Sequence, residues 1–405
     1  MSSRTAPPRA LLPLVALFCV GYLAPYLMPT VVGRLTTGLA LSGSQAGAVG
    51  SALLLASACA GFLLASRVDR IGRARLARRG LLLIAGGFAM AAATHHVALV
   101  VAGCVAGGFG SGTATAVAAV GIAGQREPHR VTVLGLLATS AVAGALYLVL
   151  PALGGGHALP LAAIGATALL VLPLTRWLSA APVTASRSEA AGPLPHRRSG
   201  LVLAASMLCW SMAQNALWGV SGRIGLDRVG LSEAALGVVF AVALGGGLLG
   251  VTAAGALGPR LGRALPVGLG TALIAGCVAV SSSAHDATAF AAGEILWNTF
   301  YPVVLSYAIG LAASLDGRGR WAVYAGSASS LGVACGPLTG AVLGAGLGFP
   351  AMGSVLAGVL LAAAVPLTAV ALGSATGGPG RVAIAVRRRR SAAAVAARSE
   401  LGRAA

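Results

Sequence analysis

Between two apolar stretches the chain reads ASRVDRIGR, from Ala65 to Arg73. Four of these nine residues are charged, although charged residues make up only 9% of the whole chain. A turn this polar between two such stretches indicates that both stretches end at a membrane surface. A related run, PRLGR, extends from Pro259 to Arg263, 190 positions later. The spacing indicates a chain built from two related halves, as in many transporters.

The composition is typical of a protein that has lipid as its solvent. Of 405 residues, 57% are hydrophobic, and the mean hydropathy is +0.88. A soluble domain carries about 25% charged residues, so this chain cannot cover a surface that faces water. The net charge of +19 would favour a nucleic-acid partner if the basic residues formed one face. They occupy the turns between apolar stretches instead, which argues against nucleic acid and for the lipid bilayer.

Twelve apolar stretches are predicted to cross the membrane. Most have the length of about 20 residues that a spanning helix needs, and the third is the shortest. The predicted spans are roughly 10–31, 43–66, 80–95, 97–121, 131–152, 158–178, 201–222, 232–257, 265–284, 287–314, 321–345 and 349–373.

The arginines predict the orientation. All 28 basic residues are arginines, since the sequence contains no lysine. With twelve spans, only Arg34, Arg223 and Arg228 fall on one side of the membrane. The positive-inside rule then places the other side, with both termini, in the cytoplasm of a cell whose cytoplasmic membrane holds the protein.

The domain organisation follows from these stretches. We expect a cytoplasmic N-terminus over 1–9 and two six-helix bundles over 10–178 and 201–373. A Pro- and Ser-containing linker over 179–200 joins them, and a basic cytoplasmic tail covers 374–405.

The run from Ala65 to Arg73 resembles the signature of the major facilitator superfamily, Gly-x-x-x-Asp-Arg/Lys-x-Gly-Arg/Lys between spans 2 and 3. Twelve spans, two halves, a central linker and a weaker second copy of the motif extend the resemblance over nearly the whole chain. The resemblance implies an all-α membrane fold of two six-helix bundles, related by a pseudo-two-fold axis along the membrane normal. It also implies a secondary transporter, expected to be a monomer without a cofactor.

In that family the motif loop is understood to lock the cytoplasmic ends of the two halves together. By resemblance, Asp69 would lie at the positive N-terminal end of the helix that starts near Trp321, with Arg73 or Arg130 paired to it. The alternative is a solvated loop that only sets topology. The predicted latch residues are Asp69, Arg70, Gly72, Arg73 and Arg130.

Two departures from the family pattern matter. Ala65 stands where the signature prefers glycine, and Pro259 replaces the aspartate of the second copy, so the predicted latch is one-sided. Family members that export drugs against protons often carry an arginine early in span 4 and a Gly-Pro pair in span 5. This chain has neither, which weakens an assignment to that group.

Polar side chains in span 10 are candidates for the transport pathway. Glu294, Asn298 and Tyr301 stand at i, i+4 and i+7, on one face of a helix. Glu294 is the only acidic residue deep within a predicted span, about 10 Å inside the outer boundary. Such a carboxyl group is a functional hypothesis by default. Two roles stay open for it, a contact with a proton or substrate and a hydrogen-bonded structural role.

Spans 1 and 7 supply the other candidates. Pro25 and Pro29 are expected to kink span 1. With those of span 10, the predicted substrate or proton pathway residues are Glu294, Asn298, Tyr301, Gln214, Asn215 and Tyr26.

The sequence therefore predicts a transporter of a small organic molecule that works by alternating access, with protons as coupling ions. Efflux is favoured over uptake because the candidate faces are aromatic and carry few charges; an uptake symporter is the alternative. An intramembrane enzyme would need paired carboxylates, a nucleophile with a base, or a metal cluster, and the spans show none of these. A sensor without transport activity is the remaining alternative. The histidines lack metal-ligand spacing, so no metal is expected.

Overall fold

The computed structural model describes residues 8–154, 156–178, 193–316 and 318–376, and all regular structure within them is helical. In chain order the helices are α1 (Pro8–Tyr26), α2 (Met28–Leu39), α3 (Gly43–Ala65), α4 (Val68–Ile71), α5 (Arg73–Ala92), α6 (Val97–Ala123), α7 (Pro128–Val149), η1 (Leu150–Leu153), α8 (Ala158–Val171), η2 (Leu172–Trp177), α9 (Arg197–Arg223), η3 (Ile224–Arg228), α10 (Glu233–Leu257), η4 (Gly258–Leu261), α11 (Ala264–Ser283), α12 (Ala287–Leu315), α13 (Arg320–Leu347) and α14 (Phe349–Thr376).

The membrane-spanning character of these helices is plain from their length and composition. Within the described residues, ten helical segments are long and apolar enough to cross a bilayer, and α1 with α2 forms an eleventh span bent by 49°. The bend falls between Pro25, inside α1, and Pro29, in the first turn of α2. Proline removes a helical hydrogen bond and crowds the preceding turn, so the predicted kink is confirmed at this place.

α5 is the twelfth long helix, and its bounds differ from the predicted span 80–95. It begins at Arg73 and ends at Ala92, so His95 lies beyond its end. Its first two turns carry four arginines, which keep it outside the apolar set. Arginine stems pack along apolar surface while the guanidinium groups reach water, so the helix continues through residues that hydropathy alone assigns to a loop.

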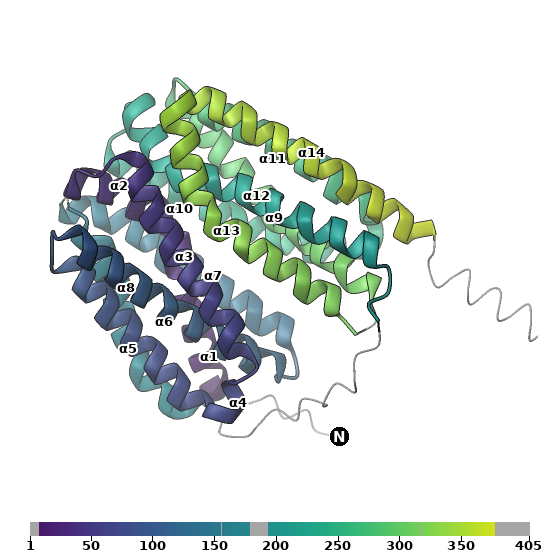
Figure 1. Cartoon of the computed structure of the whole chain (residues 1–405), viewed down its shortest axis with the longest axis horizontal. Helices are drawn as coiled ribbons and strands as arrows, with labels where there is room; N and C mark the ends of the chain where they lie inside the picture. The colour runs from purple at the N-terminus through teal and green to yellow at the C-terminus, as the bar shows by residue number, and fades with distance from the viewer. Residues whose placement is uncertain (1–7, 155, 179–192, 317, 377–405) are drawn as a thin grey trace, which may run out of the picture.

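The helices form two groups, α1 to α8 and α9 to α14, which lie side by side in Figure 1. Across the junction α3 packs on α13, α7 on α10, and α2 on α9. Figure 1 shows α3 and α13 close together near α2 and diverging toward α4. The expected all-α membrane fold is therefore confirmed. The predicted N-terminus (1–7), the first part of the linker (179–192) and the tail (377–405) lie outside the described residues.

Close helix packing within the second half depends on glycine. A Cβ atom added at Gly340 of α13 would collide with the Ala216 carbonyl of α9, and one at Gly332 would collide with the Leu208 carbonyl. Lipid tails are as apolar as the side chains, so helix association in a membrane relies on such close backbone approach. α9 and α13 are thereby held as one rigid pair beside the junction.

The helix directions separate two ends of the molecule. Arg34, Arg223 and Arg228 all lie at the end where α2 finishes and α10 begins, which we call the arginine-poor end. α4, the α6–α7 turn and the start of α13 lie at the opposite end, which we call the arginine-rich end. The alternation predicted from sequence thus recurs in space.

Candidate functional site

Glu294 of α12 is fully buried inside the second half. Its Oε1 atom accepts hydrogen bonds from Ser221 of α9 at 2.8 Å and from Ser281 of α11 at 2.6 Å. Gly293 lets α11 approach closely, because a Cβ there would lie 2.8 Å from the Ser281 Cβ. The Oε2 atom is buried and has no hydrogen-bond partner among the described residues. The site therefore holds one satisfied and one unsatisfied carboxyl oxygen.

The groups around Glu294 are neutral. Tyr147 of α7 and Cys277 of α11 lie within electrostatic range of the carboxyl group, and the two serines contact it directly. None of the ion pairs of the described residues includes Glu294. A carboxylate anion in such a place carries a desolvation cost that a neutral carboxylic acid does not carry.

Gln214 is buried and forms hydrogen bonds within the second half, so it does not line an open surface. Its Oε1 atom accepts a 3.0 Å hydrogen bond from the Trp297 indole, and its Nε2 atom donates to the Trp210 carbonyl at 3.2 Å. The side chain is fully buried. A contact between Gln214 and substrate stays a prediction, and it requires these bonds to open.

Asn215 and Asn298 are partly exposed and lie in different places. Asn215 donates to the Ser211 carbonyl at 2.9 Å, and its Cβ faces Gly336 of α13. Asn298 donates to the Glu294 carbonyl at 3.0 Å. In both residues the side-chain NH2 group donates to a carbonyl of its own helix, so the amide oxygen remains available to a ligand.

Three tyrosines meet at the middle of the molecule. Tyr22 and Tyr26 of α1 lie within electrostatic range of the Tyr301 hydroxyl of α12, and the Tyr26 hydroxyl lies beside Ser140 of α7. Tyr301 stacks on Trp210 of α9, with 5.3 Å between ring centroids. Tyr26 and Tyr301 thus lie near each other in opposite halves, and their contact with substrate stays a prediction.

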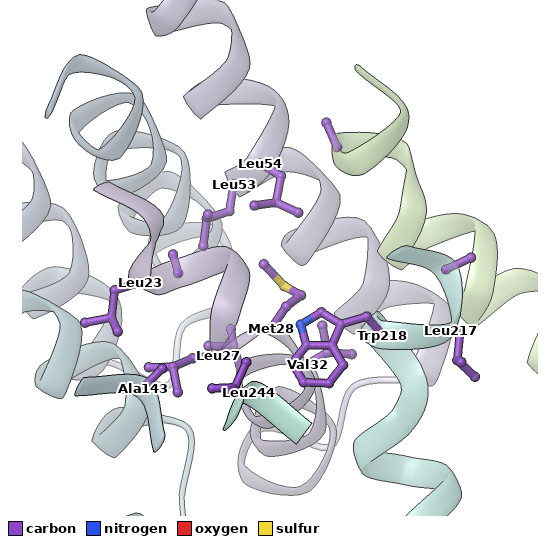
Figure 2. Close-up of a cluster of buried hydrophobic side chains, with 14 of the residues drawn as sticks. Leu23, Leu27, Met28, Val32, Leu53, Leu54, Ala143, Leu217, Trp218 and Leu244 are labelled. Carbon is purple, nitrogen blue, oxygen red and sulfur yellow. The ribbon is translucent and has the colours of Figure 1, made fainter. Parts of the chain in front are cut away.

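A cluster of buried hydrophobic side chains packs at the junction beside these tyrosines. Trp218 belongs to it and donates a 3.1 Å hydrogen bond to the Pro25 carbonyl across the junction. Met28 packs on Gly50 of α3. Figure 2 shows this cluster, whose labelled members are Leu23, Leu27, Met28, Val32, Leu53, Leu54, Ala143, Leu217, Trp218 and Leu244.

An ion pair joins the two halves at the arginine-poor end. Arg34 of α2 donates to Glu233 of α10 at 2.6 Å and to the Gly154 carbonyl at 2.7 Å. Arg34 is 6% exposed, so its charge depends on these two partners. A pocket of about 50 Å³ lies beside the pair. Sequence reasoning missed this contact because it placed Arg34 in a turn beyond the first predicted span, 10–31.

The predicted latch loop pairs within itself. Asp69 accepts a 3.0 Å hydrogen bond from Arg73, whereas Arg130 pairs with Glu127 at 3.3 Å. Gly72 has φ of 96°, a conformation that side-chain-bearing residues rarely adopt, so glycine is needed where α4 turns into α5.

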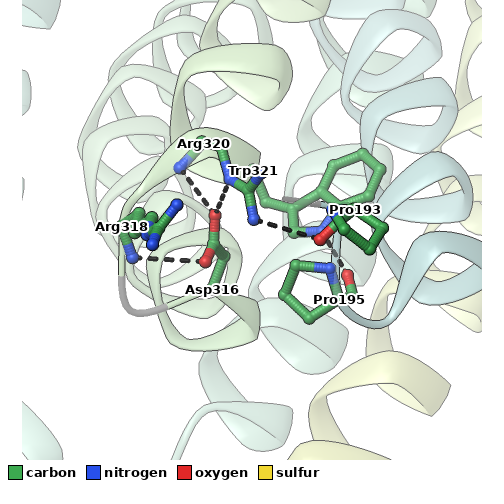
Figure 3. Close-up of polar contacts among 6 residues, drawn as sticks. All are labelled: Pro193, Pro195, Asp316, Arg318, Arg320 and Trp321. Carbon is green, nitrogen blue, oxygen red and sulfur yellow. Dashed lines mark hydrogen bonds and ion pairs between the residues drawn. The ribbon is translucent and has the colours of Figure 1, made fainter. Parts of the chain in front are cut away.

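Asp316, rather than Asp69, caps α13 in this conformation. Its carboxylate accepts hydrogen bonds from the Arg318 and Arg320 backbone amides, and from the Arg320 guanidinium at 2.6 Å. The hydrogen bond from Arg320 holds the pKa of Asp316 below its usual value. Figure 3 shows this cap and the Trp321 indole donating to the Pro195 carbonyl of the linker at 2.7 Å. Docking of Asp69 on α13 remains a prediction for another conformation.

The geometry defines a class of protein, a helical membrane protein with a junction between two bundles and polar side chains at its centre. The model of the major facilitator superfamily matches residues 14–315. The chain belongs to this superfamily, whose members are transporters. Within the described residues no group of His, Cys, Asp and Glu side chains could hold a metal ion.

Solved structures share this fold. The human organic anion transporter MFSD10 (TETRAN) is 19% identical, with a TM-score of 0.63, over 89% of this chain and 100% of that one. A bacterial homologue of the human lysosomal transporter Spinster, inward-facing and unoccupied, is 16% identical, with a TM-score of 0.65, over 92% and 96%. A variant of the nucleoside transporter NupG is 13% identical, with a TM-score of 0.68, over 89% and 99%. A comparison with curated proteins finds no match.

Proposed function

We propose that this protein is a secondary active transporter that moves a small organic molecule by alternating access between its two halves. One observation carries the proposal: the inter-half contacts described above lie at the arginine-poor end, while α3 and α13 diverge toward the other end. A junction closed at one end and open at the other is one of the two states that alternating access requires.

The orientation belongs to the same proposal. With the arginine-rich end in the cytoplasm, both termini are cytoplasmic, the protein lies in the cytoplasmic membrane, and the conformation is inward-facing. The fold likeness to the Spinster homologue, itself described as inward-facing, supports this orientation. We further propose that the functional unit is a monomer, because each chain contains both halves of the junction.

Proton coupling is assigned to Glu294. The carboxyl group is buried, and its Oε2 atom has no partner among the described residues. Binding a proton removes the cost of a buried charge, and losing it needs the hydration that a conformational change brings. Tyr147 of the first half lies within electrostatic range of Glu294, so movement at the junction would change the surroundings of the carboxyl group. In this role the two serines keep Oε1 satisfied in both protonation states.

The direction proposed is efflux, with uptake by a symporter as the alternative. The aromatic, sparsely charged centre favours efflux of an apolar solute. The organic anion and nucleoside transporters among the fold relatives show that this architecture accommodates organic molecules of different charge. Measuring whether solute accumulates in vesicles or is depleted from them distinguishes uptake from efflux.

The test uses the full chain in proteoliposomes with an imposed pH gradient and a panel of neutral, anionic and cationic organic molecules, measured by mass spectrometry. We expect gradient-driven movement of at least one compound. Glu294→Gln keeps an acceptor for both serines, so it should still fold and exchange solute while losing the response to the gradient. Glu127→Gln, at an exposed ion pair, is the matched control. An unchanged pH dependence in Glu294→Gln would eliminate its proton role.

A further inference from the structure

The three central tyrosines keep accessible surface at the junction of the two halves. Tyr22 and Tyr26 of α1 lie within electrostatic range of Tyr301 of α12, which belongs to the opposite half. Tyr22 is nevertheless 40% exposed, and the other two are partly exposed. Because these side chains keep exposed surface, accessible space lies beside them. Tyr22 and Tyr26 lie near the middle of the bent α1–α2 span, and Tyr301 lies at the middle of α12, the depth at which transporters of this build bind solutes.

Both walls of this space are aromatic and braced. On one wall Tyr301 is stacked on the buried Trp210, with an interplanar angle of 14°. On the other wall Tyr22 packs on Phe18, with 4.6 Å between ring centroids. A ring supported from behind offers its other face to a ligand at little cost in conformational entropy, and flat aromatic molecules stack best on such faces.

The space has no charge to offer a ligand. Among the described residues Glu294 is the one acidic or basic side chain deep within a span, and Arg34 lies toward the arginine-poor end of its span. Arg34 is held by Glu233 and the Gly154 carbonyl. Glu294 is fully buried behind two serines. An anion or a cation at the tyrosines would lose its hydration without gaining a partner.

Hydrogen bonding remains available at one edge of the space. Asn298 precedes Tyr301 by three residues, so both lie on one side of α12. Its amide N–H bonds the Glu294 carbonyl, and the described residues give its amide oxygen no partner. The tyrosine hydroxyls add donors and acceptors. A ligand with a polar edge is therefore accommodated better than a pure hydrocarbon.

We propose that the space between Tyr22, Tyr26 and Tyr301 binds an uncharged, flat aromatic molecule with a hydrogen-bonding edge, and that this is the class of molecule transported. The inference rests on the proposed transport function. The inference selects uncharged molecules from the neutral and charged organic molecules that proteins of this fold transport. Anions are excluded because no described cationic side chain reaches the centre.

The experiment measures binding of three isosteric probes to the full chain in lipid nanodiscs by equilibrium dialysis. The probes are 2-naphthamide, 2-naphthoate and 2-naphthylmethylammonium. We expect 2-naphthamide to bind at least about tenfold more tightly than either charged probe, because the charged groups lose hydration without compensation. Empty nanodiscs subtract partition into lipid.

Substitutions locate the binding. Tyr301→Leu should weaken 2-naphthamide binding at least about fivefold by removing the stacked face. Tyr22→Ala removes a partly exposed ring, so it should fold normally and give a similar loss. Tyr324→Ala, at the exposed Tyr324 near the arginine-rich end, is the matched control and should bind normally.

Three results would overturn the proposal: charged probes that bind as tightly as 2-naphthamide, 2-naphthamide binding unchanged by both tyrosine substitutions, and no 2-naphthamide binding up to its solubility limit. These outcomes are separable from the proposed function. Preference for 2-naphthoate with transport intact removes the substrate class alone. Binding of 2-naphthamide as described, without gradient-driven movement of any compound, removes the transport proposal alone.

Discussion

The two ends of α3 stand in different surroundings. At the arginine-poor end a Cβ atom at Gly47 would lie 2.5 Å from the Ala341 Cβ of α13, and the Ser51 hydroxyl accepts a hydrogen bond from the Leu338 amide. At the arginine-rich end Gly61 has nothing within 4 Å. One helix thus closes the junction at one end and stands free of it at the other.

The charges follow the same division. At the arginine-poor end the Arg34–Glu233 pair joins the halves and must break if they separate. At the arginine-rich end each carboxylate of the described residues pairs with an arginine three or four positions along its own chain, and none of these pairs joins the two halves. We infer that contacts at the arginine-poor end set the conformational equilibrium. The local pairs are Asp69–Arg73, Glu127–Arg130 and Asp316–Arg320.

The largest effect is expected at Gly47. Gly47→Leu forces a side chain against Ala341 and the Pro337 carbonyl. Overpacking of this kind costs about 1–3 kcal/mol, which shifts the balance toward the outward-facing state by about 5- to 150-fold. Spin-label distances between the ends of α3 and α13, measured by pulsed electron resonance, report the shift.

Gly61→Leu is the matched control because it lies on the same helix and meets no neighbour. We expect its distance distribution to equal that of the unsubstituted protein. Equal distributions for both variants would show that packing at the arginine-poor end does not set the equilibrium.

A smaller shift is expected at the inter-half ion pair. Glu233→Gln leaves the buried Arg34 with the Gly154 carbonyl as its remaining partner. Glu233 is about half exposed, so the loss lies between that of exposed and buried pairs, about 1 kcal/mol or about fivefold in population. The same distance measurement detects it. A double substitution with Arg34→Gln should add little, since each single change already breaks the pair; full additivity would show that the pair is not coupled.

Much of the fold was predictable because the solvent constrains it. Apolar length, the positions of arginines and the echo of the 65–73 run predicted the helices and their grouping. The start of α5 was missed because a helix does not stop where hydropathy falls. The length of an apolar stretch indicates which residues lie in the bilayer core. The ends of a helix depend instead on capping residues and turns, such as the one at Gly72.

The candidate site was less predictable. Helical periodicity placed Glu294 and Tyr301 on one face of α12, yet the structure separates them. Glu294 is fully buried inside the second half, while Tyr301 is partly exposed at the junction and stacks on Trp210. Periodicity gives the direction of a side chain relative to its own helix, not the neighbour it meets. The Arg34–Glu233 pair escaped for the same reason, since its members stand 199 positions apart.

A substitution at Asp69 tests whether the arginine-rich end contributes to the conformational equilibrium. In this conformation its partner is Arg73, so Asp69→Asn should leave the inward-facing population unchanged. If Asp69 docks on α13 when that end closes, losing an anion at a helix N-terminus costs about 0.5–1 kcal/mol and lowers the transport rate about two- to fivefold. Membrane insertion should be normal. Full transport activity in this variant would remove the latch.

The smallest effect is expected at Asp316, whose cap on α13 stays within one half. The lowered pKa of Asp316 results first from its hydrogen bond with Arg320. A carboxyl group with a depressed pKa in the folded state stabilises it above the ordinary value of about 4, and this contribution disappears as the pH falls through the folded-state pKa. Asp316→Asn should therefore melt below the unsubstituted protein at pH 7, and the two melting temperatures should converge below about pH 4. Scanning fluorimetry across this range measures the difference, with Glu127→Gln as the control for an exposed pair. A difference that stays constant down to pH 3 would mean that the Asp316 charge does not hold the cap.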